Sequence, residues 1–509
     1  MFIRPARRLS DLDFGPGETQ KQGKVPAIPA TAYAEFRRHA RPAATLHEGR
    51  TDAPPERLLH VVWQHQRLRR DALRTADGRH LTVLHPGFAS REPGPDFRSA
   101  LIQFDAAPPA TGDIEVDLQS AGWRGHGHDR NPAFRQVILH VVWETGGKET
   151  LPTLALKDVL DAPLTVLAEW LGSESAQQLP LELTGQCHGP LKELSAETLR
   201  ELLHQAAHTR LQAKASAFAA RARHAGWEQS LWEGLFRALG YKHNPWPLQR
   251  LAEVIAPLRA AGQAGQSALH WQARLLGIAG LLPADTADFK SQISNVKSTE
   301  LRRLWDIWWR DRDQFADAIL PRTAWRFAGI RPANHPQRRL ALAAHWLAAG
   351  DLPARIERWF TTQFPDHALA SALLEAMQPP GDDFWSRHWT FNSAPMPKPQ
   401  PLLGSTRATD LAINVILPWL WSRASAGGNE TLRREAERRY LAWPAAEDNA
   451  ILKLARQRLL GGRPLPKPLT AALQQGLLQV VRDFCDHSNA ICEQCQFPTF
   501  VQQLSKSVG

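Results

Sequence analysis

The spacing of apolar residues divides the chain at about residue 160. Before that point, short apolar and alternating runs are separated by turn-forming residues, a pattern typical of strands. Beyond it, apolar residues recur every three or four positions, as on the buried face of a helix. The clearest case is 195–226, which predicts one long helix with Ser195 as its N-terminal cap and Gly226 at its end. The pattern therefore predicts an α+β fold class, with a large all-α region after a mixed one.

Within the mixed region, the predicted elements follow a definite order. Residues 54–68 predict a helix and 131–136 a short one. The other runs predict strands, at 80–85, 94–104, 112–118, 137–144 and 151–156. The tetrapeptide HVVW occurs twice, at His60–Trp63 and His140–Trp143, and the flanking residues predict helix for the first copy and strand for the second. The core order is helix, three strands, helix, strand.

Acidic residues alternate along the third predicted strand, at Asp113, Glu115 and Asp117. Side chains two apart on a strand share a face, so the three carboxylates lie together. His126, His128 and Asp129 follow in the glycine-rich stretch RGHGHD. Carboxylate oxygens and imidazole nitrogens suit hard or borderline divalent cations, which indicates a metal site. The alternative is a strand with one solvated face followed by a flexible loop with exposed histidines.

The order of elements, with Pro95-Asp96 at the second strand and Glu115 in the third, resembles the PD-(D/E)xK nuclease superfamily. The resemblance implies a restriction-endonuclease-like αβββαβ domain in which Asp96 and Glu115 bind Mg²⁺ or Mn²⁺ for phosphodiester hydrolysis. It also suggests Glu56, on the first helix, as a third ligand. The chain departs from the family at Asp117, which stands where the family has Lys. We expect His126 or His128 to act as general base in its place, and Asp117 is able to bind a second metal.

Five segments resemble a second family, the bacterial DUF2851 family of unknown function. They are GPDFRSALI, GDIEVDLQSAGWRGHGHD, FRQVILHVVWE, LLGIAGLLP and RPANHPQRR. This resemblance implies no activity. It implies that the mixed region and the helical region form one recurring unit.

Only four cysteines occur in the chain, and three of them lie close together near the C-terminus. Cys485, Cys492 and Cys495 have the spacing C-x6-C-x2-C, and Cys187 lies far away in sequence. Thiolates suit Zn²⁺ or an iron–sulfur cluster, so we expect a structural metal on the trio. Cys187 is the natural fourth ligand, and His188 and His487 are its alternatives. The pattern resembles the iron–sulfur staple of some recombination and CRISPR-associated nucleases, except that here the distant Cys follows the carboxylate motif. Small buried thiols without a metal are the other interpretation.

The chain carries 61 Lys and Arg against 51 Asp and Glu, a formal net charge of +10. This balance favours an anionic partner, and nucleic acid, DNA above all, is the expected one. Two groups are candidate phosphate contacts: Arg210, Lys214 and Arg221 on the long predicted helix, and Arg338 and Arg339 in RPANHPQRR. A solvated helix face is the alternative interpretation of each group.

These observations predict four segments. They are a polar leader without expected structure at 1–50, the nuclease-like domain at 51–175, the helical domain at 176–470, and a C-terminal helix with a cysteine clasp at 471–509. We find no apolar run long enough to cross a membrane and no secretory signal, and we expect a cytoplasmic protein. Three functions remain open: a metal-dependent nuclease, a zinc-type metallohydrolase with another substrate, and a non-catalytic scaffold that binds nucleic acid.

Overall fold

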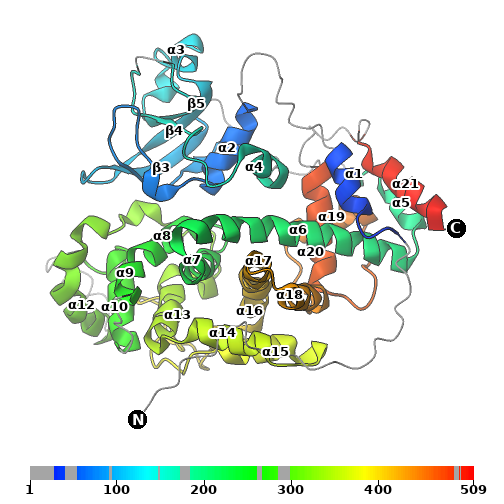
Figure 1. The fold of residues 1–509 in the computed structure, drawn as a ribbon. Helices are drawn as coiled ribbons and strands as arrows, with labels where there is room; N and C mark the ends of the chain where they lie inside the picture. The colour runs from blue at the N-terminus through cyan, green and yellow to red at the C-terminus, as the bar shows by residue number, and fades with distance from the viewer. Residues whose placement is uncertain are drawn as a thin grey trace.

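The computed structural model describes residues 28–40, 54–90, 94–146, 149–171, 184–260, 266–284, 299–485, 492 and 495–508. A mixed α+β region lies on one side of a long central helix, and a large helical region lies on the other (Figure 1). No helix in these described ranges combines the length and the apolar character needed to cross a membrane.

A six-stranded sheet forms the mixed region. Its strands are β1 (Leu81–His85), β2 (Phe88–Ala89), β3 (Phe97–Phe104), β4 (Ala110–Gln119), β5 (Val137–Glu144) and β6 (Thr153–Ala155). The main order is β1-β3-β4-β5-β6, with β2 paired to β3. Pairing is antiparallel from β1 to β4 and parallel from β4 to β6. The three predicted strands before the histidine loop and the two after it are thus confirmed.

Two helices, α2 (Glu56–His65) and α4 (Leu164–Leu171), pack together against the sheet. Leu59, Val62 and Trp63 of α2 enter one core with Ile114 and Val116 of β4. The two copies of HVVW adopt the predicted structures, helix in α2 and strand in β5. The short 3₁₀ turn η2 (Arg70–Ala72) follows α2.

The connection between β4 and β5 differs from the prediction. A nuclease-like αβββαβ order requires a helix there, and 131–136 was the expected place. The structure has instead a one-turn helix, α3 (Gly122–Gly125), and a 3₁₀ turn, η3 (Pro132–Phe134). Asn131 does cap the second turn, through its side chain and the Ala133 N–H. Pro132 suits the first turn, but the apolar β5 begins at Val137 and ends any longer helix.

Helices make up most of the remaining chain. Their bounds are α5 (His188–Glu193), α6 (Ala196–Ala225), α7 (Trp227–Leu239), α8 (Pro245–Val254), α9 (Ala256–Ala260), α10 (Ala268–Ile278), α12 (Thr299–Asp311), α13 (Pro336–Ala349), α14 (Leu352–Thr361), α15 (Leu369–Met377), α16 (Ser405–Leu411), α17 (Leu417–Ala426), α18 (Glu430–Ala442), α19 (Ala450–Leu460), α20 (Ala471–Phe484) and α21 (Phe497–Val508). Shorter turns are η4 (Arg312–Ala318), η5 (Arg322–Ala324), η6 (Pro332–Asn334), η7 (Asp366–Ala368) and the π-helical η8 (Ala412–Ile416). The predicted cap at Ser195 is present and accepts from the Thr198 N–H at 3.0 Å.

The long helix α6 joins two hydrophobic cores. Its first half, including Leu199 and Leu202, packs with α5, α19, α20 and α21. Its second half, including Leu211, packs into the large helical core, which also takes in Leu84 and Leu101 of the sheet. The boundaries expected at 176 and 471 therefore do not separate independent cores.

Part of the predicted polar leader is an ordered helix, which corrects that prediction. Helix α1 (Ala32–Ala40) packs on α6 beside α20 and α21 (Figure 1). Tyr33 is buried, and its hydroxyl donates to Asp483 Oδ2 at 2.8 Å. Arg37 Nε lies 3.0 Å from the same carboxylate, and the Phe36 ring stacks on Phe500 at 4.1 Å. A short amphipathic helix in a polar context gave too weak a pattern to predict.

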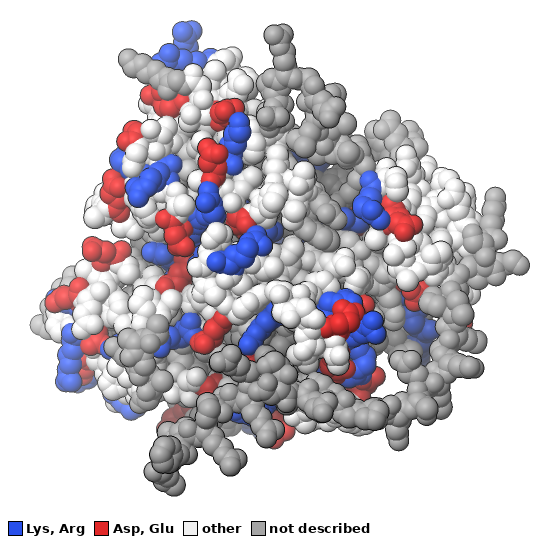
Figure 2. All heavy atoms as spheres, viewed as in Figure 1, with Lys and Arg blue, Asp and Glu red and all other residues white. Residues whose placement is uncertain are grey.

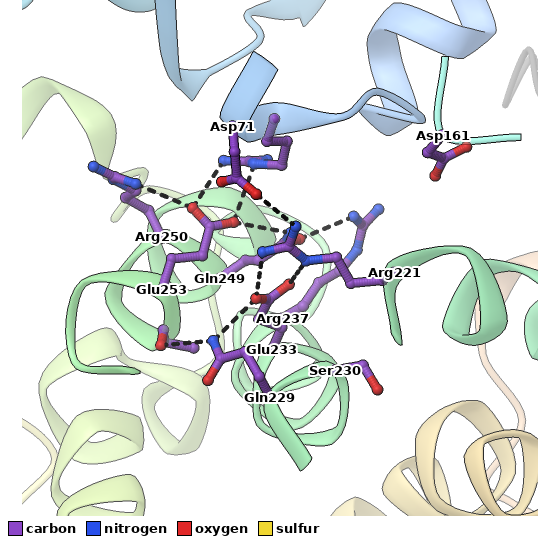
Figure 3. A network of polar contacts seen from close by, with 12 residues as sticks. Asp71, Asp161, Arg221, Gln229, Ser230, Glu233, Arg237, Gln249, Arg250 and Glu253 are labelled. Carbon is purple, nitrogen blue, oxygen red and sulfur yellow. Dashed lines mark hydrogen bonds and ion pairs between the residues drawn. The ribbon is translucent and has the colours of Figure 1, made fainter. Parts of the chain in front are cut away.

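An ionic network joins the sheet region to the helices below it (Figure 3). Arg221 of α6 binds Glu233 of α7 at 2.8 Å and lies 3.7 Å from Asp71 of η2. Arg70 of η2 binds Glu253 of α8 at 3.1 Å. Two of these contacts tie η2 of the sheet region to α6 and to α8, and the third ties α6 to α7. Together they fix the sheet region on the helices.

Candidate functional site

Asp96 and Glu115, the two residues singled out by the nuclease resemblance, are brought together at the start of β3. The Val116 N–H donates to Asp96 Oδ2 at 3.0 Å, and the Asp96 N–H donates to Glu115 Oε2 at 3.3 Å. The β3–β4 register is irregular between Phe97 and Ala100, which is typical of a bulge next to a functional site. Asp96 lies directly before β3, and Glu115 lies within the central strand β4, where it pairs with His140 of β5.

Asp117, two residues further along β4, is held from two sides. His140 Nε2 of β5 lies 2.9 Å from Asp117 Oδ2, and both side chains are buried. His126 Nδ1 lies 3.4 Å from Asp117 Oδ1. A Cβ on Gly122 would lie 2.9 Å from the Asp117 carboxyl carbon, so the α3 backbone closes over this carboxylate only because residue 122 is a glycine.

The histidine loop folds back over the carboxylate strand. The His128 ring stacks on Phe134 at 4.0 Å and meets the edge of Trp123 at 5.5 Å. This packing directs His128 Nδ1 to 3.4 Å from Glu115 Oε1. His128 is thus a half-buried, oriented imidazole, whereas His126 is 58% exposed.

Helix α2 adds two groups from the other side of the site. His60 Nε2 lies 3.5 Å from Asp96 Oδ2 and 3.7 Å from Glu56 Oε1. His60 is therefore a neighbour both of Asp96 and of Glu56, the predicted third carboxylate. His60 was not among the predicted site residues, although its spacing of four from Glu56 on a helix was a signal that could have found it.

Burial and mutual repulsion make these carboxylates difficult to ionise. Burial, reinforced by the charges of Asp96 and Asp117, raises the pKa of Glu115 to about 8. Burial also raises the pKa of Asp96 and of Glu56. Burial lowers the pKa of His128, which favours its neutral form, the form that binds metals. The site thus gathers acidic groups that lack a sufficient positive counter-charge.

The donor atoms fit a divalent cation. Asp117, His126 and His128 each offer a ligand atom, and the three atoms lie within 4.8 Å of one another. His128 Nδ1 and His60 Nε2 are buried and have no hydrogen-bond partner among the described residues. One carboxylate with two imidazoles is a ligand set for borderline cations such as Zn²⁺, whereas Asp96, Glu115 and Glu56 offer the oxygens that Mg²⁺ and Mn²⁺ prefer.

The predicted phosphate contacts are mostly committed to other roles. Arg210 Nε donates to Gln475 at 2.8 Å, and Lys214 donates to Asn414 and Gln475 at 2.7 and 2.8 Å. Arg221 belongs to the network of Figure 3. Lys214 and Arg221 do line a cavity of about 480 Å³ between α2, α6 and α7.

Arg338 and Arg339 contradict their predicted surface role. Both are buried in α13, with exposed fractions of 2% and 6%. Arg338 donates to the backbone carbonyls of Gln400 and Pro401, and Arg339 to that of Leu402. These guanidinium groups tie the proline-rich loop to α13, because a buried cation needs hydrogen-bond acceptors. They are not available to phosphates.

Exposed basic residues do occur on the histidine loop itself. Arg124, Arg130 and Arg135 are exposed on the segment that carries His126 and His128. Elsewhere the charges are mixed: on the face shown in Figure 2, the drawn Lys and Arg side chains are interspersed with Asp and Glu. In the sequence these arginines are separated by glycines and turn-forming residues. They have no helical spacing, so the sequence did not single them out as phosphate contacts.

All four cysteines converge, far from the sheet site in sequence. Cys187, Cys485, Cys492 and Cys495 line one small cavity between α5, α19 and α20. His188, a predicted alternative ligand, packs against Gly461 and is absent from that lining. His487 lies outside the described residues.

No curated protein and no solved structure matches this chain. A family model described as "Protein of unknown function (DUF2851)" matches residues 56–450. The match takes in the complete carboxylate–histidine site, from Glu56 to His140, and ends before the C-terminal cysteines. Because it covers well over half of the sequence, the chain belongs to the DUF2851 family.

Proposed function

We propose that this protein is a metal-dependent nuclease that hydrolyses phosphodiesters of nucleic acid, with DNA favoured over RNA. One observation carries the proposal: Asp96, Glu115 and Asp117 gather where β3 begins beside the central strand β4, and two buried imidazole nitrogens without hydrogen-bond partners, His60 Nε2 and His128 Nδ1, lie near Asp96 and Glu115. Structural ion pairs rarely leave buried donors unsatisfied, so the arrangement favours a binding role.

The residues that would hold Mg²⁺ or Mn²⁺ are Asp96, Glu115 and Asp117, with Glu56 as a further ligand. When bound, such an ion supplies Lewis-acid stabilisation of the phosphoryl oxygens and makes a water more acidic. Proton transfer and substrate binding would fall to the protein's own side chains.

The site lacks the Lys that the PD-(D/E)xK superfamily has two residues after the Glu. The neighbouring side chains must therefore take over its role. Asp117 replaces this Lys, and the buried His140 at 2.9 Å fixes the orientation of Asp117. A carboxylate cannot neutralise developing negative charge, so His128 takes the proton-transfer role. Its ring is held by Phe134, and its Nδ1 faces Glu115 at 3.4 Å, within reach of a water bound there. His126, more exposed on the same loop, is the second candidate.

Arg124, Arg130 and Arg135 supply contacts to the phosphate backbone. They replace Arg210, Arg338 and Arg339 in this role, because those residues are held by contacts inside the protein. Backbone contacts of this kind release counterions, so affinity should fall steeply with salt.

The first experiment incubates the full chain with labelled single- and double-stranded DNA and RNA, with Mg²⁺ or Mn²⁺. Glu115→Gln keeps the volume of the side chain but cannot ionise to bind a cation, and should reduce cleavage to background. The matched control is Glu144→Gln, an exposed carboxylate at the end of β5, which should retain wild-type cleavage.

Two other outcomes of this experiment would contradict nuclease activity. Salt-dependent binding without cleavage would select the scaffold that binds nucleic acid. Neither cleavage nor binding, in a chain with the expected helical circular dichroism, would overturn the nuclease proposal.

A zinc-type metallohydrolase is the second candidate, because one carboxylate and two imidazoles, those of Asp117, His126 and His128, bring their ligand atoms within 4.8 Å of one another. It predicts that His128→Ala lowers the affinity for Zn²⁺ much more than the affinity for Mg²⁺. Hydrolysis of ester or amide substrates with Zn²⁺ bound, without nuclease activity, would favour this function.

A further inference from the structure

The four cysteines come from three places along the chain. Cys187 directly precedes α5, Cys485 directly follows α20, and Cys492 and Cys495 lie before α21. They are the entire cysteine complement of the chain, and all four are thiols in the structure. Random placement would not bring every cysteine of a chain of 509 residues to one cavity.

The surroundings of the sulfur atoms are mostly apolar, with one cation. Leu459, Phe484 and Phe497 line the cavity, and the two Phe rings stack at 4.9 Å. The Arg458 guanidinium donates to Cys492 Sγ at 3.2 Å. A hydrogen bond from a guanidinium to a sulfur is the kind of contact that surrounds thiolate ligands in metal sites.

We propose that Cys187, Cys485, Cys492 and Cys495 bind a thiolate-ligated metal centre that fastens α5, α20 and α21 together. The proposal goes beyond the nuclease function and does not depend on it. Four thiolates leave no open coordination position, so the centre is structural rather than catalytic.

Two forms of this chemistry are open, a single Zn²⁺ ion and an iron–sulfur cluster. A tetrahedral zinc site with Zn–S bonds of about 2.3 Å requires sulfur atoms roughly 3.8 Å apart. Among the described residues, no three sulfur atoms come within 4.8 Å of one another, so the thiols must close to bind one ion. A cluster tolerates wider spacing but needs more room than the present cavity of about 10 Å³, which is near the space of one water.

The centre would close a very long loop. A link between residues 187 and 485 joins chain segments separated by the whole helical core. The N-terminal helix depends on the same region, because Phe36 stacks on Phe500 of α21. Loss of the centre should therefore loosen α21 and α1 before the large core.

The test measures metal in the full-length chain, purified without oxygen from cells supplied with zinc and iron. His126→Ala/His128→Ala is introduced as background, so that metal at the sheet site is not counted. Element analysis should find either about one zinc per chain or iron with acid-labile sulfide and visible absorption. Either result supports the thiolate centre and identifies its form.

Variants then test the ligands. Cys187→Ser and Cys492→Ser should each lower bound metal roughly tenfold or more, whereas Ser505→Ala on α21 should not. Full metal retention in Cys187→Ser would overturn its role as a ligand. If the Cys variants fail to fold, the wild-type chain still decides the question, through Co²⁺ titration. Absence of metal, together with absence of thiolate-to-cobalt absorption, would overturn the proposal.

Discussion

At the scale of single residues, the sheet site consists of four carboxylates and four histidines that lie close together. Glu56, Asp96, Glu115 and Asp117 approach one another because the first residues of α2 and the start of β3 lie close to the middle of β4. Only one imidazole, that of His140, makes a short hydrogen bond to a carboxylate of the group. The other imidazoles lie 3.4 Å or more from the carboxylates, too far for strong hydrogen bonds. A divalent cation is the counter-charge that would complete the group.

Gly122 offers a sharp test at this scale. Gly122→Ala would place a methyl group about 3 Å from the Asp117 carboxylate, so the carboxylate or α3 must shift. We expect the affinity for Mn²⁺ or Zn²⁺ to fall roughly tenfold or more, as it does when the support of a ligand is disturbed. Isothermal titration calorimetry measures this independently of any activity.

Gly125→Ala is the matched control, because a Cβ at residue 125 meets nothing within 4 Å. It adds the same methyl group to the same short helix. Equal losses of affinity in both variants would mean that backbone flexibility, rather than contact with Asp117, explains the effect.

At the scale of elements, most helices and strands follow their local pattern, and the exceptions depend on partners. β5 has the predicted bounds, because a continuous apolar run defines it. α1 was missed, since its stability comes from Asp483 and from aromatic rings near the other end of the chain. The helix expected between β4 and β5 is only two short turns, because the apolar strand β5 begins at Val137 and leaves no room for a longer one.

The docking of α1 gives an element-scale prediction. Asp483 is buried and accepts from Tyr33 and Arg37, so Asp483→Ala leaves a buried guanidinium without its carboxylate. The cost should be about 3–5 kcal/mol, as for other buried ion pairs broken on one side. Limited proteolysis should cut near α1 first, and urea unfolding should show the loss. Glu35→Ala, on the exposed side of α1, should change neither measurement.

At the scale of the whole molecule, α6 is the shared support of both cores and of the sheet region. Its Arg221 joins α7 and η2, and its N-terminal half carries α1 and α20. A second polar junction lies within the helical core, where Asp382 accepts from Gln272 of α10 and His345 of α13, each at 2.8 Å. These junctions fix how the helices are placed relative to one another.

Asp382 links this architecture to pH. Burial opposes its ionisation, but hydrogen bonds from His345, the Trp385 N–H and Gln272 outweigh burial and lower its pKa below the ordinary value of 3.8. A depressed pKa means that the carboxylate stabilises the fold above the pKa of the unfolded chain. That stability is lost as pH falls through the lower pKa of the folded state.

Asp382→Asn should therefore destabilise the protein by about 1–3 kcal/mol at pH 7, where buried donors lose a charged acceptor. The difference from wild type should shrink as pH falls below 3.8. Thermal unfolding from pH 7 to pH 3 measures it. Asp383→Asn, on the adjacent exposed residue, should follow wild type throughout. A difference that stayed constant with pH would contradict the role of ionisation.

The candidate site was predictable in part. The alternation of Glu115 and Asp117 on a strand, and the nearby His126 and His128, follow from spacing alone. His60 and His140 were not identified as site residues, because each comes from another element and joins the site only through packing. The roles of Arg338 and Arg339 were predicted wrongly, because a basic cluster looks the same in sequence whether it is exposed or buried.

By itself, the sequence determined the α+β class, nearly every strand, the long helix with its cap, and the residue types able to bind metals. Local periodicity and capping decide these features, because they involve neighbours within a few residues. The tertiary structure alone decided which side chains meet: Asp96 with Glu115, His128 with Glu115, and Cys187 with the distant trio. Such contacts depend on sheet register, bulges and helix packing, which are set by interactions between segments far apart in the chain.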